Sequence, residues 1–138
     1  MKAKLLIALI VPLTICGELS AWAKEICKGN SRVIGPCIEV RGRLSFYQGF
    51  PGFRMWWVGT KRVFGIAGGE GEEIIPEDIK EKVDDGIFVF GDFLACPITE
   101  HIPGHMQYVC VESGKNLYIE DTRRKTEMDR KKPPSSAR

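Results

Sequence analysis

Aromatic and basic side chains are concentrated in one short part of this chain, between residues 41 and 64. Aromatic rings can stack on bases or sugars and arginines can hold anionic groups, so this composition is typical of a ligand-binding face. The cluster consists of Arg41, Arg43, Phe46, Tyr47, Phe50, Phe53, Arg54, Trp56, Trp57, Lys61, Arg62 and Phe64. The residues that we expect to contact a ligand are Arg41, Arg43, Tyr47, Arg54, Trp56, Trp57, Lys61 and Arg62. In the alternative interpretation, the aromatic residues fill a small core and the cations simply alternate outward.

Trp56 and Trp57 are adjacent in a run that has the composition of a β-strand. Successive side chains of a strand point to opposite faces, so the two rings cannot both be buried on one face. We expect one of them to face outward or to lie beneath a loop. An outward tryptophan would suit a sugar or a protein contact.

The sequence offers little for catalysis. Its only histidines, His101 and His105, lie near Glu100, but Pro103-Gly104 interrupts the helical spacing that two metal-binding histidines four residues apart would use. A loop site for zinc or copper is the alternative. We find no nucleophile with a credible base, so we predict a protein that is not an enzyme and has no cofactor and no metal.

Two acidic features have structural interpretations. Glu70, Glu72 and Glu73 follow glycines without the pattern of a calcium or phosphate loop, which predicts an acidic surface loop. Asp92 lies within an apolar strand pattern, where a carboxylate needs a partner or an outward position. We expect it to pair with an arginine of the first strand.

The first 23 residues have the pattern of an export signal. Lys2 and Lys4 precede an apolar run from Leu5 to Ile15, and Ala21-Trp22-Ala23 is a small-x-small cleavage site. The run is too short for a stable membrane anchor. We therefore predict a mature chain that begins near Lys24, has no transmembrane segment and is periplasmic or secreted.

Lipidation of Cys16 is the competing interpretation of this leader. The residue before it is Ile15, which is larger than the small residue that a lipoprotein box has at that position. The address outside the cytoplasm makes intracellular nucleic acid an improbable partner, although the residue types would suit one.

Four cysteines remain after the predicted cleavage, and an even number in a small exported domain suggests two disulfides. Sequence alone allows three pairings. We favour Cys27–Cys37 with Cys96–Cys110, because each pair is close in the chain and separated by turn-rich sequence. Their spacing matches no CxxC motif, so we predict a structural role.

The charge of the chain is divided into blocks. Residues 24–65 have a net charge of +6, residues 66–121 of −10 and residues 122–138 of +5. We expect residues 24–121 to form a single domain of ordinary size. Residues 122–138 have almost no large apolar side chains, so we expect a disordered basic tail.

The periodicity of residues 24–121 is mainly that of strands. In the first, Ile38, Val40, Gly42 and Leu44 share one face, and the central glycine would allow a bulge or bend. Pro76 suits the first position of a short helix, in which Ile79 and Val83 form one apolar stripe. The expected strands are 37–47, 53–58, 62–67, 87–96 and 105–112, with a short edge at 117–119 and the helix at 76–84.

This order of three strands, a helix and two strands, with a long first strand bent at a glycine, resembles the OB-fold. That fold is a small five-stranded Greek-key barrel that binds oligonucleotides and oligosaccharides. An SH3-like barrel or a small sandwich is the alternative. Likeness of fold alone does not establish function.

Two groups of residues also resemble small exported proteins of Gram-negative bacteria that have no assigned role. The first runs from Arg41-Gly42-Arg43 to Arg62, and the second runs from Gly91-Asp92-Phe93 to Val109-Cys110-Val111. The resemblance implies a periplasmic or secreted address and carries over no catalytic residue.

We therefore expect an exported binding module for an envelope glycan, an anionic small ligand or a protein partner. The alternative function is that of a secreted inhibitor or interaction protein. It would act through an exposed loop, either Gln48 to Phe53 or Pro97 to Gly104.

Overall fold

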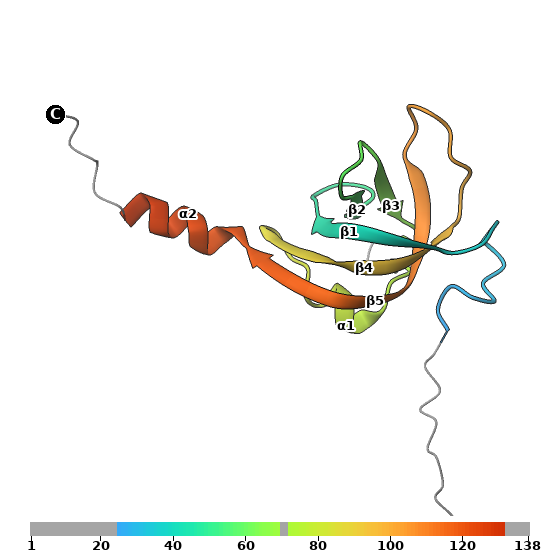
Figure 1. Ribbon diagram of the computed structural model, residues 1–138, viewed down its shortest axis with the longest axis horizontal. Helices are drawn as coiled ribbons and strands as arrows, with labels where there is room; N and C mark the ends of the chain where they lie inside the picture. Colours follow the sequence, from blue (N-terminus) through green and yellow to red (C-terminus); the bar gives the residue numbers. More distant parts are fainter. Residues whose placement is uncertain (1–24, 70–71, 132–138) are drawn as a thin grey trace, which may run out of the picture.

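The computed structural model describes residues 25–69 and 72–131. Five strands and two helices follow one another in the predicted order of three strands, a helix and two strands, after which a second helix ends the described chain (Figure 1). The elements are β1 (Ile38–Phe46), β2 (Phe53–Trp57), β3 (Val63–Ile66), α1 (Glu77–Lys80), β4 (Ile87–Pro97), β5 (Gln107–Asp121) and α2 (Thr122–Lys131). The predicted mainly-β architecture is confirmed.

The five strands form one mixed sheet whose hydrogen bonding closes into a ring, in the order β1-β2-β3-β5-β4. β1 pairs in antiparallel fashion with β2 on one side and with β4 on the other. The ring closes through a parallel pairing of β3 with the start of β5. The aromatic and basic cluster thus lies on β1, β2, β3 and the turns between them, and its members are divided between the core and the outer face.

The core lies inside this ring and follows the predicted alternation except at Ile38, which begins β1 and is 42% exposed. Val40 and Leu44 of β1 are fully buried, and the buried cluster extends to Phe64 of β3 and Phe93 of β4. Gly42 is required by packing, because a Cβ there would lie 2.7 Å from the sulfur of a core methionine. No register shift interrupts the pairing of β1, so this glycine marks a close approach rather than a bulge.

α1 is shorter than predicted, with four residues, so only Ile79 of the expected apolar stripe lies in the helix, and Val83 lies beyond its end. Ile79 and Val83 are 2% and 7% exposed. A Cβ on Gly114 of β5 would lie 2.9 Å from the Cδ1 of Ile79, so the helix packs closely against that strand. α1 therefore packs against β5, and Lys80 at its end also lies near β2, with Nζ 5.9 Å from the centroid of the Phe53 ring.

β5 is longer than the sequence predicted. The segment at 117–119, expected as a separate edge, continues the strand that begins at Gln107. Two register shifts in the β4–β5 pairing, near Gly91 and between Leu94 and Ala95, let this long pair bend while it stays paired.

The favoured disulfide pairing is wrong. Cys27 bonds to Cys110 and Cys37 bonds to Cys96, so both bridges tie the N-terminal segment to the ends of β4 and β5. Cys96 and Cys110 are nevertheless direct neighbours in the β4–β5 register. Closeness in the chain does not predict the disulfide partners here, because the segment before β1 lies across these strand ends. Two disulfides are present, as expected.

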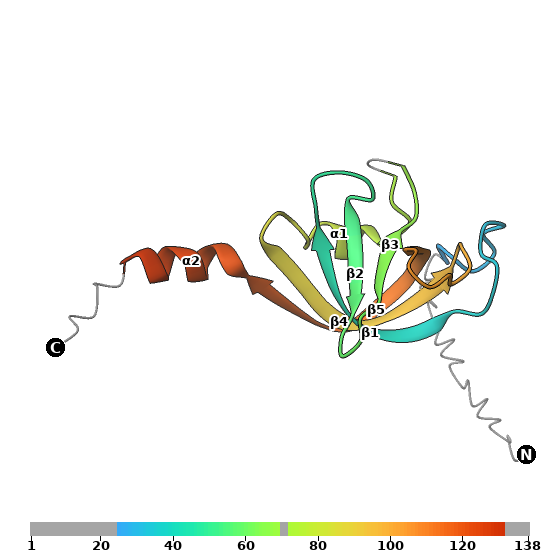
Figure 2. The same ribbon diagram turned by 90° about the horizontal axis from the view of Figure 1, so that it is seen from above.

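Residues 122–131 belong to the segment for which the sequence predicts a disordered tail. They form α2, an exposed helix that projects away from the sheet (Figures 1 and 2). The apolar burial that the segment lacks is replaced by i,i+4 contacts such as the ion pair of Lys131 with Glu127, 2.7 Å. The predicted leader and the last seven residues of the tail lie outside the described residues, as does Glu70 of the acidic loop.

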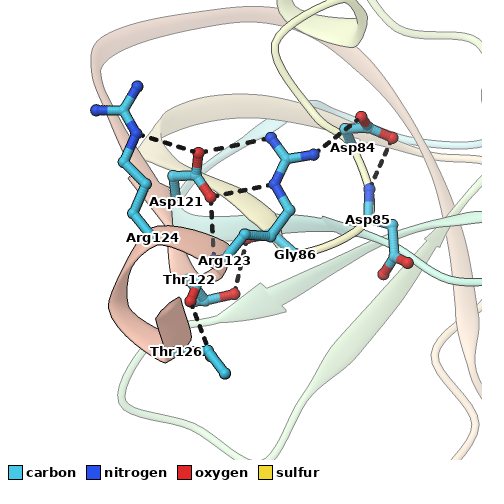
Figure 3. A network of polar contacts seen from close by, with 8 residues as sticks. All are labelled: Asp84, Asp85, Gly86, Asp121, Thr122, Arg123, Arg124 and Thr126. Carbon is cyan, nitrogen blue, oxygen red and sulfur yellow. Dashed lines mark hydrogen bonds and ion pairs between the residues drawn. The ribbon is translucent and has the colours of Figure 1, made fainter. Parts of the chain in front are cut away.

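A polar network joins α2 to the turn before β4 (Figure 3). The backbone N–H and hydroxyl of Thr122 both donate to the carbonyl oxygen of Gly86, at 2.9 and 2.8 Å. Arg123 lies between Asp121, 3.2 Å, and Asp84, 3.6 Å. The hydrogen bond from the Arg123 side chain lowers the pKa of Asp121 below its ordinary value, against the opposing effect of desolvation.

Candidate ligand-binding face

The outer face of β1 and β2 carries half of the residues that were expected to contact a ligand. Arg43 is the register partner of Trp56, and Ser45 is that of Arg54. Met55, between the two β2 residues, is fully buried. Strand alternation therefore turns Arg54 and Trp56 outward, beside Arg43.

The two adjacent tryptophans point to opposite faces, which confirms that only one is directed outward. The indole N–H of Trp56 donates to the carbonyl oxygen of Thr60, 2.8 Å, and this bond fixes the ring on the outer face. Trp57 packs against the core cluster and stacks on Phe64, with ring centroids 6.0 Å apart. Trp57 is therefore a packing residue.

Arg43 is held between two aromatic rings. Its guanidinium carbon lies 5.2 Å from the centroid of Trp56 and 4.7 Å from that of Phe88 on β4. The Nε atom is buried and has no hydrogen-bond partner among the residues that the structure describes. Contacts of this kind contribute about 0.5–2 kcal/mol each and leave the positive charge without a counter-ion.

Arg54 lies on the other side of the same surface. Its guanidinium carbon is 4.8 Å from the centroid of Tyr47, and its Nε donates to the carbonyl oxygen of Pro51, 3.2 Å. Neither Arg54 nor Arg43 takes part in any ion pair within the described ranges. The surface therefore carries two uncompensated positive charges.

These side chains enclose a shallow hollow of about 350 Å³. It is lined by Arg43, Ser45, Tyr47, Arg54, Trp56 and Val63. The lining offers positive charge, hydroxyl groups and aromatic faces, and it contains no carboxylate, imidazole or thiol. Such a set can bind an anion attached to a flat apolar body. It does not supply the paired acid and base of a hydrolase.

The remaining predicted residues lie elsewhere. Arg41 is paired with Asp92, with Nη1 and Oδ1 3.4 Å apart, as expected for an aspartate opposite the first strand. Asn116 donates to the second oxygen of Asp92, 2.8 Å. Because its charge is already balanced, Arg41 is a weaker candidate for ligand binding than Arg43.

Lys61 and Arg62 line a second hollow of about 290 Å³. Its walls are Lys61, Arg62, Val63, Phe64, His101, Gly104, His105, Met106 and Gln107. Arg62 donates to the side-chain oxygen of Gln107, 2.6 Å, and its guanidinium carbon lies 5.2 Å from the Trp57 centroid. Val63 belongs to the linings of both hollows.

The histidines of the second hollow do not form a metal site with Glu100. Within the described residues, the one group of three side chains close enough to share a metal ion is Cys27, Cys96 and Glu112. Both of these cysteine sulfurs are in disulfides. The Glu112 carboxylate instead accepts hydrogen bonds from three successive backbone N–H groups, beginning at Ile26.

A third hollow, also of about 350 Å³, lies under the turn between β1 and β2. It is lined by residues 46–52 together with Ile66, Gly68 and Glu73. Its walls are mostly apolar, and Glu73 at its edge is paired with Lys80, 2.9 Å. This hollow lacks the unpaired cations of the other two.

Sequence reasoning missed Phe88. The alternation of β4 places Phe88, Phe90 and Asp92 on one face and the buried Val89 and Phe93 on the other. This pattern is visible in the sequence, and it shows that Phe88 faces outward. The pairing of β4 with β1, which brings the ring against Arg43, involves residues about 45 positions apart and cannot be read from local sequence.

Along residues 25–69 and 72–131, no helix has the length and apolarity needed to cross a membrane.

The comparisons with known proteins do not identify the site. No family model, no curated protein and no solved structure matches the chain.

Proposed function

We propose that this chain is an exported, non-enzymatic binding protein for an anionic ligand, held in the hollow between Arg43 and Arg54. An acidic glycan of the cell envelope is the ligand class that best suits both the hollow and the predicted address. The observation that carries the proposal is Arg43, whose charge is clamped between two rings without a counter-ion.

A half-buried cation without a counter-ion costs solvation free energy that its cation–π contacts offset only in part. A carboxylate or sulfate in the hollow would accept charge-assisted hydrogen bonds from Arg43 and Arg54, worth about 1.5–3 kcal/mol each. The rings of Trp56 and Tyr47 would meanwhile offer flat apolar surfaces to a sugar ring. The hollow therefore suits a ligand that is both anionic and cyclic.

The closed sheet supports an OB-fold as the finer description of the architecture. β1 pairs with both β2 and β4, and α1 lies between β3 and β4 in the chain. OB-folds commonly bind oligosaccharides and oligonucleotides on the surface around strands 2 and 3. The hollow lies on that part of the surface, although likeness of fold alone would not justify a function.

Export is supported by the leader pattern of the sequence and by the two disulfides, which persist in oxidising compartments. A periplasmic or secreted protein meets envelope glycans and soluble anions rather than intracellular nucleic acid. The predicted address thus limits the candidate ligands to anions that are found outside the cytoplasm.

The first test is titration of the secreted mature protein with hexagalacturonate, an acidic oligosaccharide, using uncharged maltohexaose as the comparison. Arg54→Gln should weaken hexagalacturonate binding about 10-fold or more, because it removes one charge-assisted contact of about 1.4 kcal/mol or more. Arg54 is only partly buried and Tyr47 is exposed, so the loss of their contact in this variant should change the thermal midpoint little.

Arg32→Gln is the matched control, since Arg32 is an exposed arginine before β1 and lines none of the three hollows. It should leave the dissociation constant unchanged within a factor of two or so. The proposal would be contradicted if the acidic and neutral hexasaccharides bound equally tightly, or if Arg54→Gln and Arg32→Gln weakened hexagalacturonate binding to the same extent.

A second candidate is an interaction protein that acts through an exposed loop. Phe50 in the β1–β2 turn is 68% exposed, and Ile102 in the loop before β5 is 53% exposed. Apolar side chains displayed on loops can anchor a protein partner. Phe50→Ala separates the candidates, because it removes such an anchor while leaving Arg54 and the anion hollow in place.

A further inference from the structure

We propose that the ligand is a chain with at least two anionic groups, which bridges the hollow at Arg43 and Arg54 and the second hollow at Lys61 and Arg62. This inference rests on the proposed function and specifies its ligand class as an acidic oligosaccharide rather than a small anion. Two observations support it: Val63 lines both hollows, and positive charges lie on either side of Val63.

The two hollows adjoin each other at Val63 of β3, which lines both of them. Val63 is 39% exposed and is the register partner of Trp56, so it separates the hollows as a low apolar ridge. A ligand that spans both hollows would run from β1 across β2 and β3 to the residues just before β5, beside Gln107. Three interstrand steps of ~4.8 Å give a path of about 14 Å.

Both hollows are positively charged. Among the described residues, none of Arg43, Arg54, Lys61 and Arg62 is in an ion pair. No carboxylate lines either hollow. Two uncompensated cationic hollows on one surface are complementary to a ligand that repeats its negative charge.

The second hollow is also held in a fixed geometry. Arg62 is oriented by its hydrogen bond to Gln107, whose amide nitrogen donates to the carbonyl oxygen of Thr99, 2.9 Å. The aromatic rings of Trp57 and Phe64 lie 5.2 and 5.0 Å from the guanidinium carbon. A positioned guanidinium costs less ordering entropy on binding than a free one.

A chain that engages both hollows gains affinity through effective concentration, since the second contact becomes intramolecular. A short ligand occupies one hollow at a time and gains nothing from the other. Affinity should therefore rise with chain length until both hollows are engaged, and then level off.

The test titrates the secreted mature protein with galacturonate oligomers of two, four and six sugar units at fixed ionic strength. We expect the wild type to bind the hexamer about 10-fold or more tightly than the dimer. Lys61→Gln and Arg62→Gln should each reduce this length advantage. Lys61 is exposed, so its variant retains the fold even if Arg62→Gln perturbs the packing on Trp57.

Lys125→Gln in α2 is the matched control for loss of an exposed lysine, and it should keep the full length dependence. Equal affinity for dimer and hexamer, with Arg54→Gln still weakening both, would overturn the bridging inference and leave the single-hollow function standing. Absence of binding at every length would overturn both. Tighter binding of hexathymidylate than of the hexagalacturonate would overturn the assignment to an acidic oligosaccharide.

Discussion

At the residue scale, arginine and aromatic side chains work as pairs on this surface. Arg43 contacts Trp56, Arg54 contacts Tyr47 and Arg62 contacts Trp57. In each pair the ring shields one face of the guanidinium, while the edge with its N–H donors stays available for an acceptor. The clustering of these two residue types therefore reflects a local structural unit as well as a shared location.

The two tryptophans should respond differently to truncation. Trp57→Ala should lower the free energy of unfolding by about 2–3 kcal/mol, somewhat less than truncation of a fully buried tryptophan, because Trp57 is only partly buried against the core. Trp56→Ala should cost about 1 kcal/mol or less and should instead weaken hexagalacturonate binding.

Urea unfolding of the two variants and the wild type, followed by the same titration, checks this assignment. Equal destabilisation by both substitutions would show that Trp56 also belongs to the core. Unchanged ligand affinity in a stable Trp56→Ala variant would show that the Trp56 ring does not contact the ligand.

The inward or outward direction of individual residues could be predicted well from sequence, because strand alternation is a local property. It separates Trp56 from Trp57 and predicts an outward position for Asp92 on β4. The contact of Phe88 with Arg43 and the disulfide partners could not be predicted, since both depend on which distant segments become neighbours.

At the scale of elements, the positions of the strands could be predicted from the sequence, and so could the lengths of all of them except β5. The limits of β1, β2 and β4 agree with the period of apolar residues to within one residue at each end. β5 runs beyond its apolar part because pairing with β4 continues to Asp121. Backbone hydrogen bonds extend that strand through residues with no alternating pattern.

The junction between β5 and α2 should depend on pH. The carboxylate of Asp121 has a lowered pKa in the folded protein, chiefly through its hydrogen bond from Arg123. Its stabilising contribution is therefore complete above the ordinary aspartate range, about 3.9, and is lost as the pH falls through the lower folded-state value.

Arg123→Gln should raise the midpoint of the Asp121 side-chain titration, followed by carboxyl carbon NMR. Arg124→Gln is the matched control and should produce a smaller rise, because the Nε of Arg124 lies farther away, 3.8 Å from the carboxylate. A titration midpoint that is the same in wild type and in Arg123→Gln would show that the arginine does not set it.

At the scale of the whole molecule, the closed ring depends on the parallel pairing of β3 with β5, which joins Phe64 to Gln107. Nothing in the local sequence of either strand specifies this contact. The order of elements favours a closed five-stranded fold, but the ring itself forms only when distant segments meet. The second hollow is a product of this closure, because it brings Lys61 and Arg62 beside His101 and His105, about 40 residues later in the chain.

The two disulfides should contribute strongly to stability, because they close long segments of chain. Their cysteines are 83 and 59 residues apart, and removal of such a bridge typically costs about 2–5 kcal/mol. We expect the double variant Cys37→Ser with Cys96→Ser to lose stability in this range in urea unfolding.

Peptide mapping of the wild type under non-reducing conditions should recover Cys27 linked to Cys110 and Cys37 linked to Cys96. Recovery of Cys27 linked to Cys37 would contradict this connectivity. A double variant as stable as the wild type would show that the Cys37–Cys96 bridge adds no stability to a segment that is also held by the Cys27–Cys110 bridge.

The register that places Cys96 directly opposite Cys110 has a consequence for maturation. The β4–β5 hairpin brings these two thiols together by local folding alone, whereas their native partners must arrive from the far end of the chain. An oxidant acting on the early hairpin would trap a misbridged form, which is resolved when a thiolate attacks the wrong disulfide and releases one of its cysteines. The yield of native protein should therefore follow the supply of disulfide isomerase in the producing cell more closely than the supply of oxidase.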